Sequence, residues 1–489
     1  MDYKGTKDSV TKDDVTVVDI GAAKKAVTAT SIGNAMEWFD FGIYSYLAVT
    51  IGKVFFPEVD GPMQLVYAFA TFAVAFLVRP IGGIFFGMLG DRMGRKKVLA
   101  ITLVMMAIAT LAIGLIPSYE SIGVTASILL LIARLVQGFS TGGEYSGAMT
   151  FIAESTPDKK RGIMASWLEV GTLTGYIAGS GLVTLLTFIL GSETMLEWGW
   201  RIPFLIAGPI GIVGLYLRNQ LEETPAFEAM EKAKDNKKEH ISLKELLVFH
   251  KNPLLIGILL VFFYNVTNYM VLSYMPSHLT AVLGYGETNG LLLILIVMCV
   301  MIPIVLLMGY FSDRIGGKNI ISGGLTGLII FSVPAFYMIG TGNTWLVFLG
   351  ILILAIFLAA FQGTMPSLLP SLYFTDVRYG ALSITYNLSA SLFGGTTPLA
   401  VAWLINETAN NYVPSYYLTA ASVIGIVVVL FLVKDPTGKP LRGSPPAVEK
   451  EQEIQAAVKK GQAEGLWWKE EKKEIEGKIQ AQKSEESLN

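Results

Sequence analysis

Long apolar segments, each near the length of a membrane-spanning helix, recur along the chain and constrain its fold more than any other feature. Hydrophobic residues make up 52% of the 489 residues and charged residues only 16%, whereas about 25% of the residues of a soluble protein are charged. The charges lie at the termini and in short gaps, which is typical of a polytopic helical membrane protein. We therefore predict an all-α membrane protein with twelve transmembrane helices, at residues 27–52, 63–90, 98–117, 123–153, 162–190, 199–218, 253–278, 289–310, 319–339, 345–372, 380–405 and 413–433.

A polar stretch divides these spans into two halves of six. The expected organisation is an N-terminal segment (1–25), a first six-helix half (26–219), a linker (220–251), a second six-helix half (252–434) and a tail (435–489). Basic residues gather in the gaps on the side of both termini, and acidic residues predominate in the opposite gaps. By the positive-inside rule, we expect both termini in the cytoplasm.

Two loop motifs occur in both halves at matching positions. Residues 87–96 (GMLGDRMGRK) are echoed by residues 309–318 (GYFSDRIGGK), and the turn 157–162 is echoed by 375–380. The glycines let two helices approach, and Asp91 can cap or pair near the end of a neighbouring helix. We assign the loops to gating and topology rather than to substrate contact. The candidate gating residues are Arg79, for which a purely structural role is equally open, Asp91, Arg95, Arg161, Asp313, Arg314 and Arg378.

Ionisable residues inside the predicted spans indicate function, because a carboxylate at membrane depth is costly and normally faces the protein interior or a water-filled path. In the first span, Asn34, Glu37, Asp40 (or Phe41) and Tyr44 share one helical stripe. A second stripe in span four carries Arg134, Gln137 and Glu144 (or Tyr145). The candidate proton-coupling residues are Asp40, Glu37, Arg134 and Glu144, with Arg134 as the expected partner of Asp40. Glu169, a further ionisable residue inside a span, is interpreted as a residue that supports the site from behind or as a helix contact.

The second half offers neutral and aromatic side chains where the first half offers charges. Aromatic faces attract a quaternary ammonium or prolinium ion, and the carboxylate of such a solute needs an arginine, amide or hydroxyl donor. The candidate substrate-binding residues are Asn34, Trp38, Phe39, Tyr44, Gln137, Tyr145 and Trp167 in the first half, and Tyr264, Asn265, Asn268, Tyr269, Phe361, Gln362, Tyr386 and Asn387 in the second.

Five motifs carry a resemblance to a known family: residues 33–42 (GNAMEWFDFG), 79–83 (RPIGG), 137–145 (QGFSTGGEY), 198–204 (WGWRIPF) and 221–225 (LEETP). They resemble the metabolite:proton symporter family of the major facilitator superfamily, over residues 25 to 435. The resemblance implies the major facilitator fold and uptake of zwitterionic osmoprotectants, such as proline and glycine betaine, with protons and under osmotic stimulation. Asp40 and Arg134 resemble the first-helix acid and fourth-helix arginine of the superfamily's proton-coupled sugar carriers.

Several alternatives stay open at this point. A proton symporter for citrate, shikimate or oxoglutarate would need more cationic residues facing the substrate, but Arg79, Arg134 and Arg201 keep it in consideration. The Asp40–Arg134 pair can be a static clamp, and a non-transporting osmosensor is a further reading. An intramembrane enzyme would need a nucleophile–base or metal constellation, which the three histidines do not indicate.

The expected partners are a small zwitterionic solute and membrane lipid, without nucleic acid; the sequence names no protein partner. We expect no metal and no cofactor apart from the co-transported proton, in an integral plasma membrane protein of a bacterium. The tail has a helix-forming composition, but glycines at 461 and 465 make a long coiled coil doubtful. Trp467 and Trp468 can instead rest at the membrane interface, or the tail can be solvated.

Overall fold

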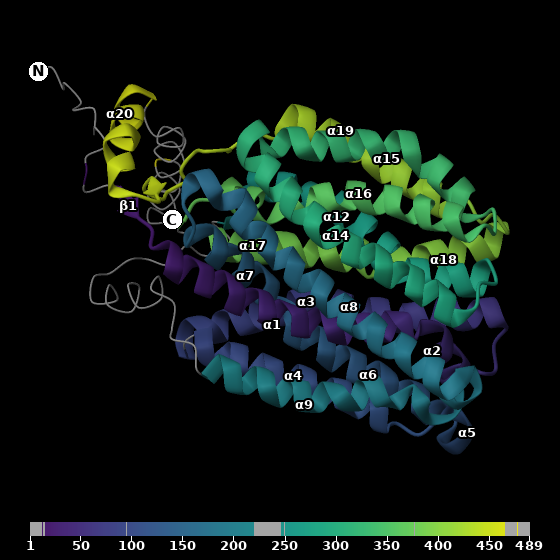
Figure 1. Cartoon of the computed structure of the whole chain (residues 1–489). Coiled ribbons are helices and arrows are strands. Elements are labelled where there is room, and N and C mark those ends of the chain that lie inside the picture. The colour runs from purple at the N-terminus through teal and green to yellow at the C-terminus, as the bar shows by residue number, and fades with distance from the viewer. Residues whose placement is uncertain are drawn as a thin grey trace, which may run out of the picture.

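The computed structural model describes residue 12 and residues 15–93, 95–219, 246–248, 250–375, 377–464 and 477; residues 87, 88, 90–93, 95–100, 213–219, 287 and 461–464 are described by their backbone alone. Helices dominate it (Figure 1). The first half contains α1 (Ile20–Tyr46), α2 (Ala48–Phe55), α3 (Gly61–Met93), α4 (Arg95–Leu115), α5 (Tyr119–Ile122), α6 (Val124–Ser140), η2 (Thr141–Gly143), α7 (Glu144–Glu154), η3 (Asp158–Lys160), α8 (Arg161–Thr194), η4 (Met195–Gly199) and α9 (Arg201–Asn219).

The second half repeats this plan. It contains α12 (Lys251–Asn268), η5 (Tyr269–Tyr274), α13 (Met275–Ser277), η6 (His278–Val282), α14 (Glu287–Ile315), α15 (Gly317–Ile339), α16 (Thr344–Leu368), η7 (Pro370–Leu372), α17 (Arg378–Ser389), η8 (Ala390–Gly394), α18 (Thr396–Thr408) and α19 (Val413–Leu432). In Figure 1 the purple-to-teal helices of the first half lie below the green-to-yellow helices of the second.

The predicted spans correspond to helical segments of the structure. Within the described residues, nine helices are long and apolar enough to cross a membrane, and two shorter apolar helices cover Ile101–Leu115 and Arg201–Ile212. Helix α1 supplies the remaining crossing element, and its polar stripe explains why hydropathy alone does not select it. The first span is longer than predicted and breaks at Leu47, where α1 ends and α2 begins. Span four also breaks, at the turn Thr141–Gly143 between α6 and α7.

The interface between the halves includes two helix pairs that are related by the repeat. Helix α8 packs on α14, and α3 packs on α18 and α17. By span number these pairs are five with eight and two with eleven, so each pair is the image of the other under exchange of the halves. The internal repeat read from the loop motifs is therefore reproduced in the packing.

The chain segments near the two termini meet at one end of the bundle. Strand β1 (Thr16–Val17) pairs in parallel with β2 (Ala447–Val448), followed by η9 (Glu451–Glu453) and α20 (Ile454–Glu464). Figure 1 places β1 and α20 beside each other at the left end, beyond the helices. Two ion pairs fasten this segment to the turn before α8, Lys159 with Glu453 at 2.9 Å and Lys160 with Glu449 at 2.6 Å. The predicted tail thus begins with an ordered, docked segment, while Trp467 and Trp468 lie outside the described residues.

Candidate functional site

The polar stripe of α1 faces the protein interior because small residues let α1 approach α8 closely. A Cβ atom at Gly171 would collide with the carbonyl of Ser31, and one at Gly175 with the carbonyl of Ala35. Such small-residue contacts are a common means of helix association in membranes. The two glycines therefore fix which face of α1 turns toward the interface between the halves.

Asn34 strengthens the same contact. Its Nδ2 donates to the Leu168 carbonyl at 2.9 Å and to the Thr172 hydroxyl at 2.8 Å. Its Oδ1 accepts from Nε1 of Trp38 at 3.0 Å. In this structure Asn34, a predicted substrate residue, holds α1 on α8 and orients the Trp38 indole.

Two of the sequence motifs, residues 79–83 and 137–145, lie where α3 and α6 cross. A Cβ atom at Gly82 would collide with the carbonyl of Phe139, and one at Gly138 with the carbonyl of Ala75. Backbone meets backbone here, so α3 and α6 approach as closely as helices can. This crossing sets the depth of Arg79, which lies one turn before Gly82 on α3.

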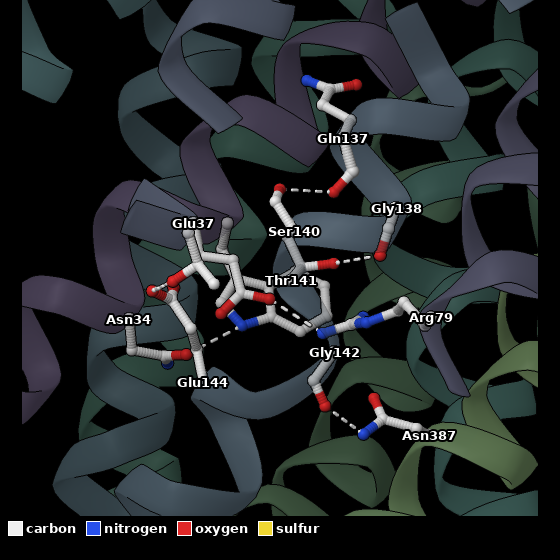
Figure 2. A network of polar contacts seen from close by, with 12 residues as sticks. Asn34, Glu37, Arg79, Gln137, Gly138, Ser140, Thr141, Gly142, Glu144 and Asn387 are labelled. Carbon is white, nitrogen blue, oxygen red and sulfur yellow. Dashed lines mark hydrogen bonds and ion pairs between the residues drawn. The ribbon is translucent and has the colours of Figure 1, made fainter. Parts of the chain in front are cut away.

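Arg79 lies in the middle of the protein and is paired with the first acid of the α1 stripe. Its Nη2 donates to Oε1 of Glu37 at 2.8 Å, with side-chain exposures of 1% and 2% (Figure 2). The guanidinium also faces the rings of Phe41 and Phe76, at 5.5 and 5.4 Å from their centroids. Within the described residues, Nε and Nη1 of Arg79 have no hydrogen-bond partner. The structure therefore does not place Arg79 at a loop gate, where we expected it.

Asp40 does not contact Arg134 directly, which corrects the predicted pair. Asp40 Oδ2 accepts from the Thr110 hydroxyl at 3.0 Å, and Thr110 accepts in turn from Gln137 Nε2 at 2.6 Å. Arg134 Nη1 donates to Oε1 of the same Gln137 at 2.6 Å. The reason is geometric: Gln137 lies one turn after Arg134 on α6, and α4 brings Thr110 between them and α1. The sequence analysis did not identify Thr110.

Aromatic faces surround the Arg134 guanidinium. It lies 4.1 Å from the centroid of the Tyr44 ring and 5.2 Å from that of Phe72. The Tyr44 hydroxyl is bonded away from it, to Thr71 and the Ala68 carbonyl. Tyr44, predicted to contact substrate, therefore presents its ring face to an arginine of the protein itself.

Glu169 lies beside residues of the central site, which favours the first of its two predicted roles over a helix contact. It is fully buried and accepts a hydrogen bond from the Tyr145 hydroxyl, and Tyr264 of the second half lies beside it. The signal was present, because any intramembrane acid is a functional candidate. Trp167, a predicted substrate residue two positions earlier on α8, is instead 46% exposed. Residues two positions apart on a helix point in nearly opposite directions. Because Glu169 points inward, Trp167 faces outward, away from the site.

A cluster of aromatic rings joins the halves at the centre. The Trp38 ring lies 5.3 Å from Tyr176 and 6.1 Å from Tyr269, and Tyr269 lies 5.2 Å from Phe76. Tyr145 packs against Tyr386 of the second half at 4.4 Å. The sequence analysis did not single out Phe76 and Tyr176.

Two predicted aromatic residues lie apart from this cluster. Phe361 packs against Phe263 at 5.3 Å and against Gly324, inside the second half. Phe39 is buried on α1 but makes no ring contact within the described part of the chain. The prediction that Phe361 faces the midplane cluster is therefore wrong, because α16 turns this ring toward α12 and α15.

The predicted amides of the second half differ in their partners. Gln362 Nε2 donates to Asn268 Oδ1 at 3.1 Å, and Asn387 Nδ2 donates to the carbonyl of Gly142 in the first half (Figure 2). Asn265 is fully buried, yet neither Oδ1 nor Nδ2 has a partner among the described residues. Asn265 is thus the amide most open to a ligand.

Glu144, the fourth proton-coupling candidate, has a different hydrogen-bond partner from Asp40. It accepts from the Thr102 hydroxyl of α4 at 3.1 Å. Among the described residues, no cluster of three or more His, Cys, Asp or Glu side chains has the spacing of a metal site.

Loop residues from the two halves close the end that carries β1 and β2. Asp313 of α14 caps α8, accepting from the backbone N–H groups of Gly162 at 2.6 Å and Ile163 at 2.9 Å. Arg378 of α17 pairs with Glu154 of α7 at 2.5 Å. We expected such a role, a cap or a pair, for Asp91 of the first loop motif; Asp313, the matching residue of the second motif, caps α8.

The other predicted gating residues differ. Arg161 pairs with Asp158 in its own half and donates to the Lys439 carbonyl of the following segment at 3.2 Å. Arg314 is exposed and stacks on Tyr310 at 4.3 Å, so it does not bridge the halves here. The side chains of Asp91 and Arg95 lie outside the described residues.

The opposite end contains a small crevice between the halves. Its lining comes from the end of α1 and α8 and from the start of the second half, and includes Tyr46, Thr187, Ser277 and Thr280. A second crevice lies at the β1 end, beside Asp313 and Ser367.

Comparisons with known proteins agree with this architecture. Residues 30–398 match the family model of the Major Facilitator Superfamily. The glycine betaine/proline/ectoine/pipecolic acid transporter OusA of Dickeya dadantii is 48% identical over 442 residues, covering 89% of this chain and 88% of that protein. The proline/betaine transporter of Salmonella typhimurium is 48% identical over 451 residues, covering 91% of this chain and 90% of that protein.

A solved structure shows the same fold at low sequence identity. The proton:xylose symporter XylE bound to 6-bromo-6-deoxy-D-glucose superposes with a TM-score of 0.70 and 19% identity, covering 89% of this chain and 99% of that chain. The prediction of a transporter rather than an enzyme is confirmed by the family and its relatives. Because the family model matches residues 30–398, which are most of the chain, the chain belongs to the major facilitator superfamily.

Proposed function

We propose that this protein takes up zwitterionic osmoprotectants, such as proline and glycine betaine, by proton symport with alternating access, and that high osmolality stimulates it. The observation that carries the substrate class is the similarity to proteins named for these solutes, at 48% identity over about nine-tenths of both chains. The alternative, a carboxylate such as citrate or shikimate, is less well supported, because neither of these two relatives is named for such a solute.

Asp40 is the proposed proton carrier. Support comes from its burial on α1 and from its hydrogen bond with a neutral group, the hydroxyl of Thr110. A buried carboxylate held by a neutral group can lose or gain a proton without breaking an ion pair. Arg134 is proposed to act on Asp40 through Gln137 and Thr110. Glu37 and Glu144 are the secondary candidates.

We propose that alternating access opens one end of the protein while the other end closes. The Asp313 cap and the Arg378–Glu154 pair would open when the crevice at the opposite end closes. We further propose that the end carrying β1 and β2 is cytoplasmic, in a bacterial plasma membrane, because lysine and arginine are concentrated in the loops on that side.

Competition uptake in proteoliposomes tests the substrate class. Radiolabelled glycine betaine would be accumulated under an imposed proton gradient, in the presence of excess proline, ectoine, citrate or shikimate. We expect proline and ectoine to compete and citrate and shikimate to have no effect. Competition by the carboxylates alone would replace the proposal with the alternative.

A further inference from the structure

Arg79 combines complete burial with incomplete hydrogen bonding. Its side chain is 1% exposed, and only Nη2 has a partner, the carboxylate of Glu37. Nε and Nη1 have none among the described residues. A guanidinium carries five N–H donors in a planar array that suits carboxylates, and leaving such donors unpaired in a buried place is costly. The free donors therefore mark a place where an anionic group can bind.

The surroundings of Arg79 come from both halves. Phe76, which faces the guanidinium, packs on Tyr269 at 5.2 Å. Gly394 of η8 lies against both Tyr269 and Asn265, whose amide has no partner among the described residues. A ligand at Arg79 would thus touch both halves, as a ligand of an alternating-access carrier must.

A surface for a cation adjoins the same place. Trp38 packs near both Tyr176 and Tyr269, at 5.3 and 6.1 Å between ring centroids. Several aromatic faces around one point attract a quaternary ammonium. A binding place for an anionic group and one for an ammonium group therefore lie next to each other, which is the charge pattern of a zwitterion.

A row of packed aromatic rings connects this place to the crevice at the end opposite β1. Tyr46 lines the crevice and packs against Tyr176 at 6.0 Å, and Tyr176 packs in turn on Trp38. The Tyr176 hydroxyl meets the Ser273 hydroxyl of the second half at 3.1 Å. The Tyr46 hydroxyl likewise donates to Sδ of Met298 in the second half at 3.6 Å, so both tyrosines link the halves beside the crevice.

We propose that Arg79 binds the carboxylate of the substrate, that Trp38, Tyr176 and Tyr269 surround its ammonium group, and that Glu37 occupies Arg79 when substrate is absent. The assignment rests on the proposed function, since it presumes a zwitterionic solute. It changes the role of Glu37 from a candidate proton carrier to a counter-ion that competes with the substrate carboxylate. Removal of this competitor should leave binding intact, whereas removal of Arg79 should not.

Equilibrium binding to the purified full-length protein in detergent tests this, with glycine betaine and choline as probes. Choline keeps the ammonium group but has a hydroxyl in place of the carboxylate. Arg79→Gln should weaken glycine betaine binding by about 10- to 100-fold, the range expected for hydrogen bonds to a charged group. Glu37→Gln should bind glycine betaine at least as tightly as the unmodified chain. Lys53→Gln, which removes a positive charge from the exposed side of α2, is the control and should bind normally.

The double variant Glu37→Gln/Arg79→Gln is the control for misfolding. It removes both members of the buried pair and so leaves neither charge unpaired. It should bind glycine betaine as weakly as Arg79→Gln and lose the preference for glycine betaine over choline. If the two single variants weaken binding equally and the double variant restores it, the pair is a structural clamp and the proposal is overturned. Normal affinity and selectivity in the double variant also overturn it. An unmodified chain that binds neither glycine betaine nor proline would instead overturn the proposed function itself.

Discussion

Arg79 of α3 donates to Glu37 of α1 at 2.8 Å, and neither side chain is more than 2% exposed. The neighbouring Asp40 forms no ion pair within the described residues and is held by the hydroxyl of Thr110. Two acids one helical turn apart therefore have different chemistry. One neutralises an arginine, and the other is free of a cationic partner. This difference separates a residue suited to substrate binding from a residue suited to carrying a proton.

The first prediction concerns coupling at Asp40. Asp40→Asn mimics the protonated carboxyl group, so it should abolish accumulation of glycine betaine against a gradient while preserving exchange of substrate present on both sides. Proteoliposome uptake and counterflow measure the two activities. Arg134→Ala should damage both, because it leaves Gln137 without its charged partner and opens a cavity beside Tyr44. If Asp40→Asn accumulates substrate normally, the proton carrier lies elsewhere and Glu144 is the next candidate.

The second prediction concerns the aromatic cluster. A desolvated cation–π contact contributes about 2 kcal/mol, roughly thirtyfold in affinity. Trp38→Leu and Tyr269→Leu should therefore raise the half-saturation concentration for glycine betaine by about tenfold or more. Phe361→Leu is the matched control, because this ring packs inside the second half. An equal rise for Phe361→Leu would show that general packing, not ammonium binding, explains the effect.

The third prediction concerns the Asp313 cap on α8. Loss of a helix cap costs about 1 kcal/mol, which corresponds to roughly a fivefold change in an equilibrium. Asp313→Ala should therefore open the β1 end several-fold more often. A cysteine at Ser367, which lines a crevice beside Asp313, reports this through its rate of maleimide labelling in a Cys299→Ser background. Glu407→Ala, an exposed acid at the opposite end, should leave the rate unchanged. An unchanged labelling rate in Asp313→Ala would show that the cap does not hold this end closed.

The fourth prediction concerns the docked segment that contains α20. The Lys159 ammonium donates to Glu453 and lowers the pKa of this carboxyl below its ordinary value of 4.5. The ion pair therefore stabilises docking fully above that value and is lost as the pH falls through the lowered pKa. Both side chains are partly exposed, so the effect is small and screened by salt.

The distance between spin labels at Gln455 and Thr16 measures this docking. The distribution of distances should broaden in Glu453→Gln at neutral pH. The double exchange Lys159→Glu/Glu453→Lys should restore the narrow distribution. No broadening in Glu453→Gln would mean that the ion pair does not hold the segment and that the β1–β2 pairing is sufficient.

Much of the fold followed from the sequence because hydrophobic length is nearly decisive in a membrane. Helix positions, the two halves and a capping or pairing role for the aspartate of the loop motif all came from local patterns. The partners of the buried charges did not, because they depend on how helices cross. Arg79 reaches Glu37 only because Gly82 and Gly138 bring α3 and α6 together. Thr110, an ordinary residue of an apolar span, reaches Asp40 by the packing of α4.

Local sequence patterns also did not predict which side chains of a span are exposed. Trp167 and Glu169 both looked buried in an apolar span, and only the orientation of α8 separates them. Phe361 lies at the predicted depth, but its ring points into the second half. Depth along a helix can be read from a sequence more easily than direction around it.

Substrate-driven proton movement is the most direct test of the central claim. Glycine betaine would be added to proteoliposomes without any imposed gradient in a weakly buffered medium, and the external pH recorded. Symport predicts alkalinisation of the medium on addition of glycine betaine or proline, unchanged by removal of sodium and abolished by a protonophore and in Asp40→Asn. Uptake of glycine betaine with no change in external pH, or uptake that follows a sodium gradient alone, would contradict the account.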